Sequence, residues 1–134
     1  MDAKVHLWSI RSFKRTASIE GPTNSVNTLS LTSEENLLAT GAEGTLSIWD
    51  VSTWTENRRI ELPAKGVLLT ALSPDGEKIY VSIDNLIAGY TLREGNLILE
   101  IPLSIKGVYG LALSPDGSLL ANAGADGNIR IWEI

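Results

Sequence analysis

Cysteine is absent from this chain, and His6 is the only histidine. A chain without cysteine has no disulfide framework and no thiolate metal site, and a single histidine offers no imidazole cluster for a metal ion. Long apolar segments are missing too, since no segment approaches the roughly 18 apolar residues of a membrane-spanning helix. The first residues, MDAKVHLWSI, lack the basic and then apolar regions of a signal peptide. We therefore expect no cofactor, no metal and no membrane span, and a cytoplasmic location by default.

Positive charge is scarce as well. Against 16 aspartate and glutamate residues there are 11 lysines and arginines, which gives a formal net charge of −5. An acidic surface gains no counterion-release energy from nucleic acid or from an anionic membrane, so neither is expected as a partner. The charged fraction of 20% and the hydrophobic fraction of 43% argue against disorder. A length of 134 residues suits a single domain that buries its own core.

The hexapeptide ALSPDG occurs twice, at residues 71–76 and 112–117, a separation of 41 residues. Many other positions keep the same spacing, with one residue inserted in the last repeat. The residues in register are Ile19, Ile60 and Ile101; Val26, Val67 and Val108; Leu31, Leu72 and Leu113; and Trp8, Trp49, Tyr90 and Trp132. A period of this length indicates a stack of supersecondary units in which no single unit buries its apolar face alone.

Within each period, apolar and polar residues alternate, as in the Leu-Ser-Ile-Trp stretch at 46–49. This pattern predicts β-strands with one face inward and one face toward water. Short turns such as SPDG, Glu43-Gly44 and Asp126-Gly127 separate the strands. No stretch keeps a helical period, so the prediction is all-β with four strands per repeat. They are strand a near Val26, Val67 and Val108; b near Leu38, Ile79 and Leu120; c ending at Trp49, Tyr90 and Trp132; and d near Ile19, Ile60 and Ile101.

Four antiparallel strands repeated every 40 to 45 residues and carrying an Ile-Trp-Asp strand resemble the WD40-repeat β-propeller family. The resemblance rests on GTLSIWDV at 44–51, LLANAGADGNIRIWEI at 119–134 and both SPDG turns, and it covers essentially the whole chain. It implies an all-β fold of about three propeller blades, each a four-stranded antiparallel sheet. By analogy it implies a non-enzymatic scaffold that binds other proteins.

The chain departs from the family pattern in two places. Family members usually carry a Gly-His pair before strand a, whose histidine joins a polar network with a Ser or Thr, a turn Asp and the Trp, and no such histidine exists here. The middle repeat has Gly89-Tyr90-Thr91 where the pattern has Ile-Trp-Asp, so we expect that blade to be the least regular. Asp126 matches the turn Asp, and its carboxylate is expected to bind nearby backbone N–H groups.

No constellation in the sequence indicates catalysis, because a tuned base placed against a nucleophile is missing. His6 shares the register of Ser47 and Arg130, which we take as the polar, outward face of strand c. Asp75 and Asp116 look like a carboxylate pair, but each lies inside an SPDG turn, where Asp has a structural task. We therefore expect that the protein is not an enzyme.

Six of the aromatic residues fall into two groups by their place in the repeat. Four of them share one repeat phase and are expected to pack in the core or between blades: Trp8, Trp49, Tyr90 and Trp132. Trp54 is different, because it falls in the turn from strand c to strand d, in register with Phe13 and Gly95. Aromatic residues at exposed turn tips are candidates for partner contact, so Phe13 and Trp54 are candidate binding residues. The alternative is that they lie flat on the neighbouring blade.

A second candidate surface lies on the opposite rim, in the loops from strand d to strand a. Lys65 and Lys106 repeat there in register, and Asn24 takes the equivalent place in the first repeat. In the family this rim is a frequent docking surface, so an acidic peptide is a conceivable ligand. The alternative is that the two lysines are simply solvated.

The repeat phases are approximately 1–25 (strands c and d), 26–66, 67–107 and 108–134 (strands a, b and c), which together hold 13 strands of a single partial propeller domain. Propellers typically close with four to eight blades, and an open wedge of three leaves strand edges and apolar faces in water. We therefore expect a homo-oligomer, most simply a dimer that closes a six-bladed ring.

In that ring, strand d of each chain completes the last blade of the other, which leaves one strand c too many at each junction. A fragment of a longer propeller or the product of a truncated gene therefore stays open as an explanation. The first hypothesis for function is a protein-binding module. The alternative is a self-assembling element without a separate ligand.

Overall fold

The computed structural model describes residues 4–20, 25–32, 36–42, 44–63, 67–104 and 107–134. Within these ranges every regular element is a β-strand, thirteen in all, in four antiparallel sheets. The all-β prediction is confirmed. Because no helix occurs in the part of the chain that is described, no helix there can cross a membrane.

Each sheet is a meander in which consecutive strands pair. The N-terminal hairpin consists of β1 (Lys4–Ser9) and β2 (Lys14–Glu20). The first blade consists of β3 (Thr28–Leu31), β4 (Leu37–Ala42), β5 (Thr45–Asp50) and β6 (Thr55–Glu61). The second blade consists of β7 (Val67–Leu72), β8 (Lys78–Ile83), β9 (Leu86–Thr91) and β10 (Leu97–Pro102). The third, with three described strands, consists of β11 (Val108–Leu113), β12 (Leu119–Gly124) and β13 (Ile129–Glu133).

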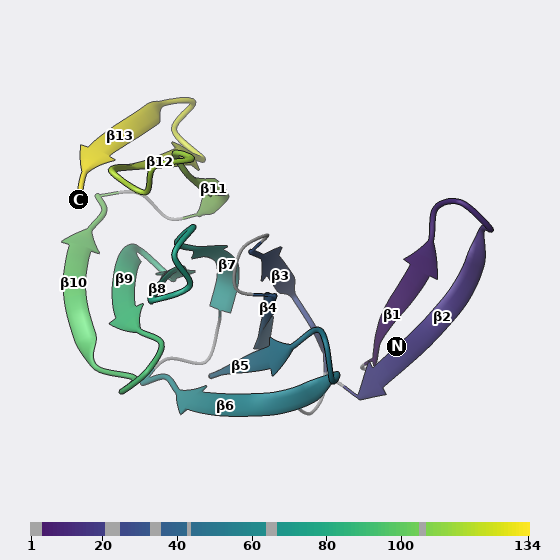
Figure 1. Ribbon diagram of the computed structural model, residues 1–134. Coiled ribbons are helices and arrows are strands. Elements are labelled where there is room, and N and C mark those ends of the chain that lie inside the picture. Colours follow the sequence, from purple (N-terminus) through teal and green to yellow (C-terminus); the bar gives the residue numbers. More distant parts are fainter. Residues whose placement is uncertain (1–3, 21–24, 33–35, 43, 64–66, 105–106) are drawn as a thin grey trace.

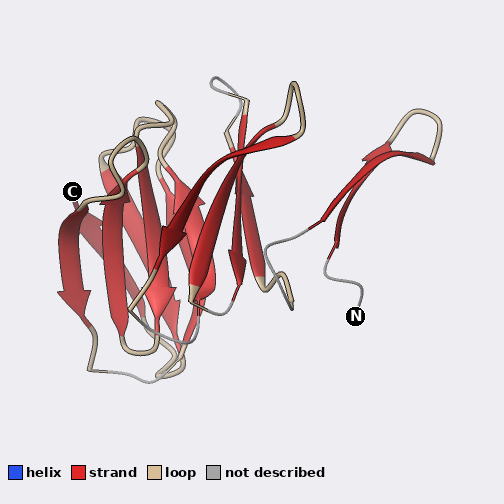
Figure 2. Cartoon of the chain, turned by 90° about the horizontal axis from the view of Figure 1, so that it is seen from below, coloured by secondary structure: helices blue, strands red, loops and turns tan. Residues whose placement is uncertain are grey.

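The three blades stand in an arc with their first strands, β3, β7 and β11, on the inner side (Figure 1). The hairpin lies apart from this arc at one end, as Figure 2 also shows. It meets the first blade through an apolar cluster that joins Ile19 and Val5 to Leu38 and Trp49. The strand expected near Val26 is β3, which begins two residues later at Thr28.

The two SPDG turns have the structure that their residues predict. Asp75 accepts a hydrogen bond from the Glu77 amide at 3.0 Å, and Asp116 accepts one from the Ser118 amide at 3.1 Å. Each carboxylate also accepts a hydrogen bond from the serine hydroxyl two residues before it. The serine hydroxyls and these amides lower the pKa of both carboxyl groups, that of Asp116 to about 2. The structural task expected for both aspartates is thus confirmed.

The core lies between blades, so the middle strands of a complete blade are covered on both faces. One apolar cluster joins β4, β5 and β6 to β7, β8 and β9, and a second joins the second blade to the third. The expectation that alternate residues face water is therefore wrong for the middle strands. Ser47 is fully buried, and His6, in the same register on β1, is half-buried rather than outward.

The aromatic residues of the shared repeat phase do not share one environment. Trp49 and Tyr90 are buried and Trp132 is half-buried, as expected for packing between strands and blades. Trp8 is 61% exposed, so its expected core position is wrong. It lies on β1 of the two-stranded hairpin, at one end of the arc (Figure 1).

Candidate functional site

The strands β3, β7 and β11 lie side by side on the inner side of the arc (Figure 1). A groove is lined by residues of these three strands. Its volume is about 610 Å³. The three strands line its walls, and Pro74 and Pro115 of the SPDG turns contribute to one end of it. Residues from three repeats thus meet at one place, which makes the groove the principal candidate for a binding site.

The wall between the first and second blades is closed by hydroxyl groups. The Thr70 amide donates to the Thr28 hydroxyl at 3.1 Å, and the Leu72 amide donates to the Ser30 hydroxyl at 3.0 Å. The hydroxyls of Thr28 and Thr70 lie a further 3.2 Å apart and form another hydrogen bond. Side chains of β3 therefore occupy the amides on the free edge of β7.

The wall between the second and third blades differs. One repeat after Thr28 and Ser30 stand Leu69 and Ala71, which carry no hydrogen-bond acceptor in their side chains. The equivalent amides on β11 belong to Leu111 and Leu113, and both residues line the groove. The bridge made by Thr28 and Ser30 therefore cannot be repeated, and β11 presents edge amides beside apolar side chains.

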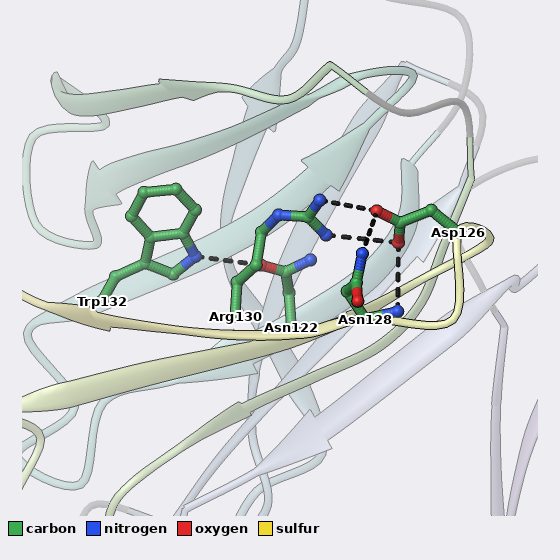
Figure 3. Close-up of polar contacts among 5 residues, drawn as sticks. All are labelled: Asn122, Asp126, Asn128, Arg130 and Trp132. Atoms are coloured by element: carbon green, nitrogen blue, oxygen red, sulfur yellow. Dashed lines mark hydrogen bonds and ion pairs between the residues drawn. The ribbon is translucent and has the colours of Figure 1, made fainter.

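A buried polar contact distinguishes the blades from one another. The Trp49 indole donates to the Thr40 hydroxyl at 3.0 Å. In the third blade the Trp132 indole donates to the side-chain oxygen of Asn122 at 2.9 Å (Figure 3). In the second blade the same two positions hold Tyr90 and Val81. Blades with tryptophan thus supply an acceptor, and the blade without it supplies none.

Asp126 organises the turn between β12 and β13 (Figure 3). It accepts a hydrogen bond from the Asn128 amide at 3.2 Å, which confirms the expected contact with a backbone N–H. It also forms an ion pair with Arg130 at 2.6 Å. The Arg130 guanidinium, followed by the Asn128 amide groups, lowers the pKa of the Asp126 carboxyl. Sequence reasoning missed Arg130, although residues four apart across a tight hairpin turn are expected to meet.

The predicted partner-binding residues have different surroundings. Phe13 and Trp54 both have positive φ, 54° and 57°, like Gly95 at 75°, so the three turns share one conformation. Phe13 is 83% exposed, whereas Trp54 is half-buried and packs on the cluster of Leu38 and Trp49. Partner contact by these two residues stays a prediction. The other three candidates, Asn24, Lys65 and Lys106, lie outside the described residues.

A second hollow of about 500 Å³ lies at one end of the second blade, between the SPDG turn that follows β7 and the turn between β9 and β10. Its lining includes Asp75, Lys78, Arg93 and Glu94, so charges of both signs are mixed there. The Asp75 carboxylate is already bound to the Glu77 amide of its own turn. The hollow therefore shows no preference for a positively or a negatively charged ligand. Across the described residues, no group of three or more His, Asp and Glu side chains is placed to hold a metal ion.

Comparison with known protein families gives a match to a repeat family. The model of the WD40 family, described as "WD domain, G-beta repeat", matches residues 13–50 and 100–133, together more than half of the chain. The unmatched stretch between them contains Gly89 and Tyr90, where the middle repeat departs from the pattern. No curated protein matches the chain.

Proposed function

Because the chain belongs to the WD40-repeat family, whose repeats generally mediate protein–protein interaction, we propose that it is a non-enzymatic module that binds an extended segment of another protein. WD40-repeat proteins are typically scaffolds without catalytic activity. We assign the binding of this segment to the groove between β3, β7 and β11.

The observation that carries this assignment is the difference between the two walls of the groove. Amides on the β7 edge are occupied by Thr28 and Ser30, whereas those of Leu111 and Leu113 face Leu69 and Ala71. An extended segment offers backbone carbonyl oxygens to such edge amides and apolar side chains to the surrounding leucines. The partner expected here is therefore an extended, apolar peptide segment.

A single substitution tests the assignment. In Ala71→Ser, a hydroxyl stands one repeat after that of Ser30 and should occupy the Leu113 amide from within the chain. The matched control is Ala112→Ser, which adds the same hydroxyl at an exposed alanine. The native chain and the control should retain random extended peptides displayed on phage. Ala71→Ser should retain at least tenfold fewer phage. Retention of peptides equally by both variants would refute the groove, and retention of none would refute the module.

Self-assembly is a second candidate function. Apolar residues that are buried between the first and second blades have repeat equivalents that are exposed at the two ends of the arc. Leu46 and Ile48 of β5 pack with Leu72 of the second blade in one buried cluster. In the third blade Ile129 takes the place of Leu46 and is 75% exposed. In the first blade Leu31 takes the place of Leu72 and is 64% exposed. The two ends of the arc therefore carry the two halves of one blade-to-blade contact.

We propose that two copies close through these halves as a homodimer with a six-bladed ring. Fully burying one such side chain contributes about 1.5–3 kcal/mol, and each contact recurs by symmetry. Light scattering of the native chain at micromolar concentration should give twice the chain mass, and Ile129→Lys should give the chain mass. Ile98→Lys, at an exposed isoleucine of β10, is the control that should stay dimeric. A stable monomer of the native chain would overturn the proposal.

A further inference from the structure

We propose that two pairs of residues fix the order in which the hairpin, the first blade and the second blade stack. Each pair joins a side chain of a fourth strand to the residue at the tip of the next sheet's turn between its third and fourth strands. The pairs are Ala17 with Trp54 and Arg58 with Gly95, and the corresponding members of the two pairs lie 41 residues apart. This inference goes beyond the proposed binding function and does not depend on a ligand.

The contact between the first and second blades has its large side chain on the strand. The turn between β9 and β10 lies against β6 (Figure 1), and Nη2 of Arg58 donates to the Glu94 carbonyl oxygen at 2.6 Å. A Cβ atom at Gly95 would lie 3.3 Å from the same Nη2 atom and 3.7 Å from Cγ1 of Ile60. Arg58 therefore occupies the space that a side chain at the tip of this turn would need.

The contact between the hairpin and the first blade has its large side chain on the turn. Trp54, at the tip of the turn between β5 and β6, packs on the apolar cluster that includes Ile19 of β2. Ala17 is half-buried and lies two residues before Ile19, on the same face of the strand. It takes the repeat position of Arg58, just as Trp54 takes that of Gly95. A small residue on the strand thus accompanies a large residue on the turn.

The backbone of the turns does not explain this difference. The φ angles of Trp54 and Gly95 are 57° and 75°, so both tips have the left-handed conformation. Because tryptophan adopts this conformation at 54, the turn itself does not require glycine at 95. The Arg58 side chain of the neighbouring blade is what excludes a larger residue there.

Exchanged pairs would fit badly. The turn of Trp54 against Arg58 would bring two large side chains into one space, and overpacking destabilises a protein. The turn of Gly95 against Ala17 would leave a void, which is unfavourable as well. Because the two blades are meanders of the same kind, sheets of different copies could otherwise stack in the wrong order during folding. The size pairs discriminate against such contacts.

Arg58 is not the residue that stability alone would favour. Its Nε atom is buried and has no hydrogen-bond partner among the described residues. A buried donor without an acceptor destabilises the folded state, and an apolar residue such as Leu99, at the next repeat position, avoids this loss. We therefore attribute the arginine to its fit with the turn of Gly95.

A double-mutant cycle in the full chain tests the size pairing. Gly95→Trp should raise the equilibrium constant for unfolding in urea about tenfold, because the ring meets Arg58. Adding Arg58→Ala recreates the combination of Ala17 and Trp54, so the double variant should unfold less readily than Gly95→Trp. The control is Gly95→Trp with Arg59→Ala, because Arg59 is exposed and lies on the other face of β6. Equal recovery with both alanine substitutions, or with neither, would overturn the pairing.

Refolding tests whether the pairs select the order. Arg58→Ala with Gly95→Trp gives both contacts the alanine–tryptophan pair, and Ala17→Arg with Trp54→Gly gives both contacts the arginine–glycine pair. A fourfold variant with all these changes exchanges the pairs and keeps the two contacts different. Each chain is diluted from urea at several micromolar concentrations. Size-exclusion chromatography then measures the fraction that returns to the elution position of the native chain.

The native chain and the fourfold variant should refold alike, whereas each double variant should lose roughly threefold more material. This loss should grow with protein concentration, because the wrong contacts form between copies. Equal refolding of all four chains would overturn the inference, as would a fourfold variant that fails like the double variants. A double variant that is merely destabilised would lose the same fraction at every concentration, and this result would also overturn it. If one double variant does not fold, the other carries the same test.

Discussion

Removal of the Thr40 hydroxyl should destabilise the protein only while Trp49 is present. Thr40 is completely buried, and its hydroxyl accepts the Trp49 indole N–H at 3.0 Å. Thr40→Val keeps the shape of the side chain and leaves the indole N–H without this acceptor in a buried site. An unsatisfied buried donor costs about 1–3 kcal/mol, and the added methyl group recovers part of this, so we expect a net loss of about 1–2 kcal/mol.

The second blade supplies the matched background for this test. It carries Val81 and Tyr90 at the two positions, so a valine is compatible there with an aromatic ring that has no N–H group. In a Trp49→Tyr background, Thr40→Val should therefore cost less than about 0.5 kcal/mol. The reverse change, Val81→Thr, should destabilise the native chain, because it buries a hydroxyl beside Tyr90.

Urea unfolding followed by far-UV circular dichroism measures all these variants on one scale, because the signal does not depend on tryptophan. The four proteins of the Thr40 and Trp49 cycle give a coupling free energy, expected to be about 1–2 kcal/mol. If Thr40→Val costs the same in both backgrounds, the hydrogen bond does not explain the pairing of residue types, and the reasoning fails.

The remaining predictions concern three other positions. Gly89→Ile should lower the free energy of unfolding by about 1–3 kcal/mol, because a Cβ atom there meets the Tyr80 ring at 3.0 Å. Adding Tyr80→Ala should recover at least half of this loss in urea unfolding. A double variant no more stable than Gly89→Ile would contradict this. Trp54→Gly should change stability by less than about 2 kcal/mol, because relief of the positive φ offsets the loss of a half-buried ring; a larger loss would show that the ring is core. The pKa of Asp116 is lowered to about 2, so its carboxylate stabilises the fold at neutral pH, and this contribution disappears as the pH falls from about 4 to about 2. Asp116→Asn should therefore flatten the pH dependence of the thermal unfolding midpoint between these two pH values. An unchanged slope would refute this prediction.

Local chemistry made the strands and turns predictable from the sequence. Pro and Gly in SPDG, with an Asp side chain that binds the following amide, specify a turn without reference to distant residues. The 41-residue spacing then placed fourth strands near Ile19, Ile60 and Ile101, and these residues lie on β2, β6 and β10. The same spacing placed a first strand near Val26, and β3 begins two residues after it, at Thr28.

Burial depended on neighbours that a single repeat does not reveal. Ser47 and His6 occupy one register, yet Ser47 is buried because the second blade packs on one side of the first blade and the hairpin on the other, whereas His6 lies on the end hairpin and is half-buried. Trp8 and Trp49 differ for the same reason. The middle blade has register shifts in two of its strand pairs, β7 with β8 and β9 with β10, whereas the first blade has one, so it is the less regular of the two four-stranded blades. In it Tyr80 lies opposite Gly89, where the first blade has Ala39 opposite Ile48. In the first blade the larger residue of the pair lies on the third strand, whereas in the second blade it lies on the second strand.

The groove could not be found from one repeat, because its walls come from three. A signal was present in hindsight: Thr28 and Ser30 carry hydroxyls at positions where the next repeat has Leu69 and Ala71. The register alone does not show that these hydroxyls reach the neighbouring strand. Only the packing of β3 beside β7 shows which amides they occupy.

The meander order of the sheets has a consequence for how the chain folds. Every described strand pair joins consecutive strands, so each blade forms by closing short loops, and stacking follows as one formed sheet templates the next. The hairpin of β1 and β2 packs on the first blade at one end of this stack, so we expect it to open at a lower free energy than the strands buried inside the blades. Its amides should exchange with solvent deuterium before those of β8 and β9, so the hairpin can leave its place while the blades remain folded.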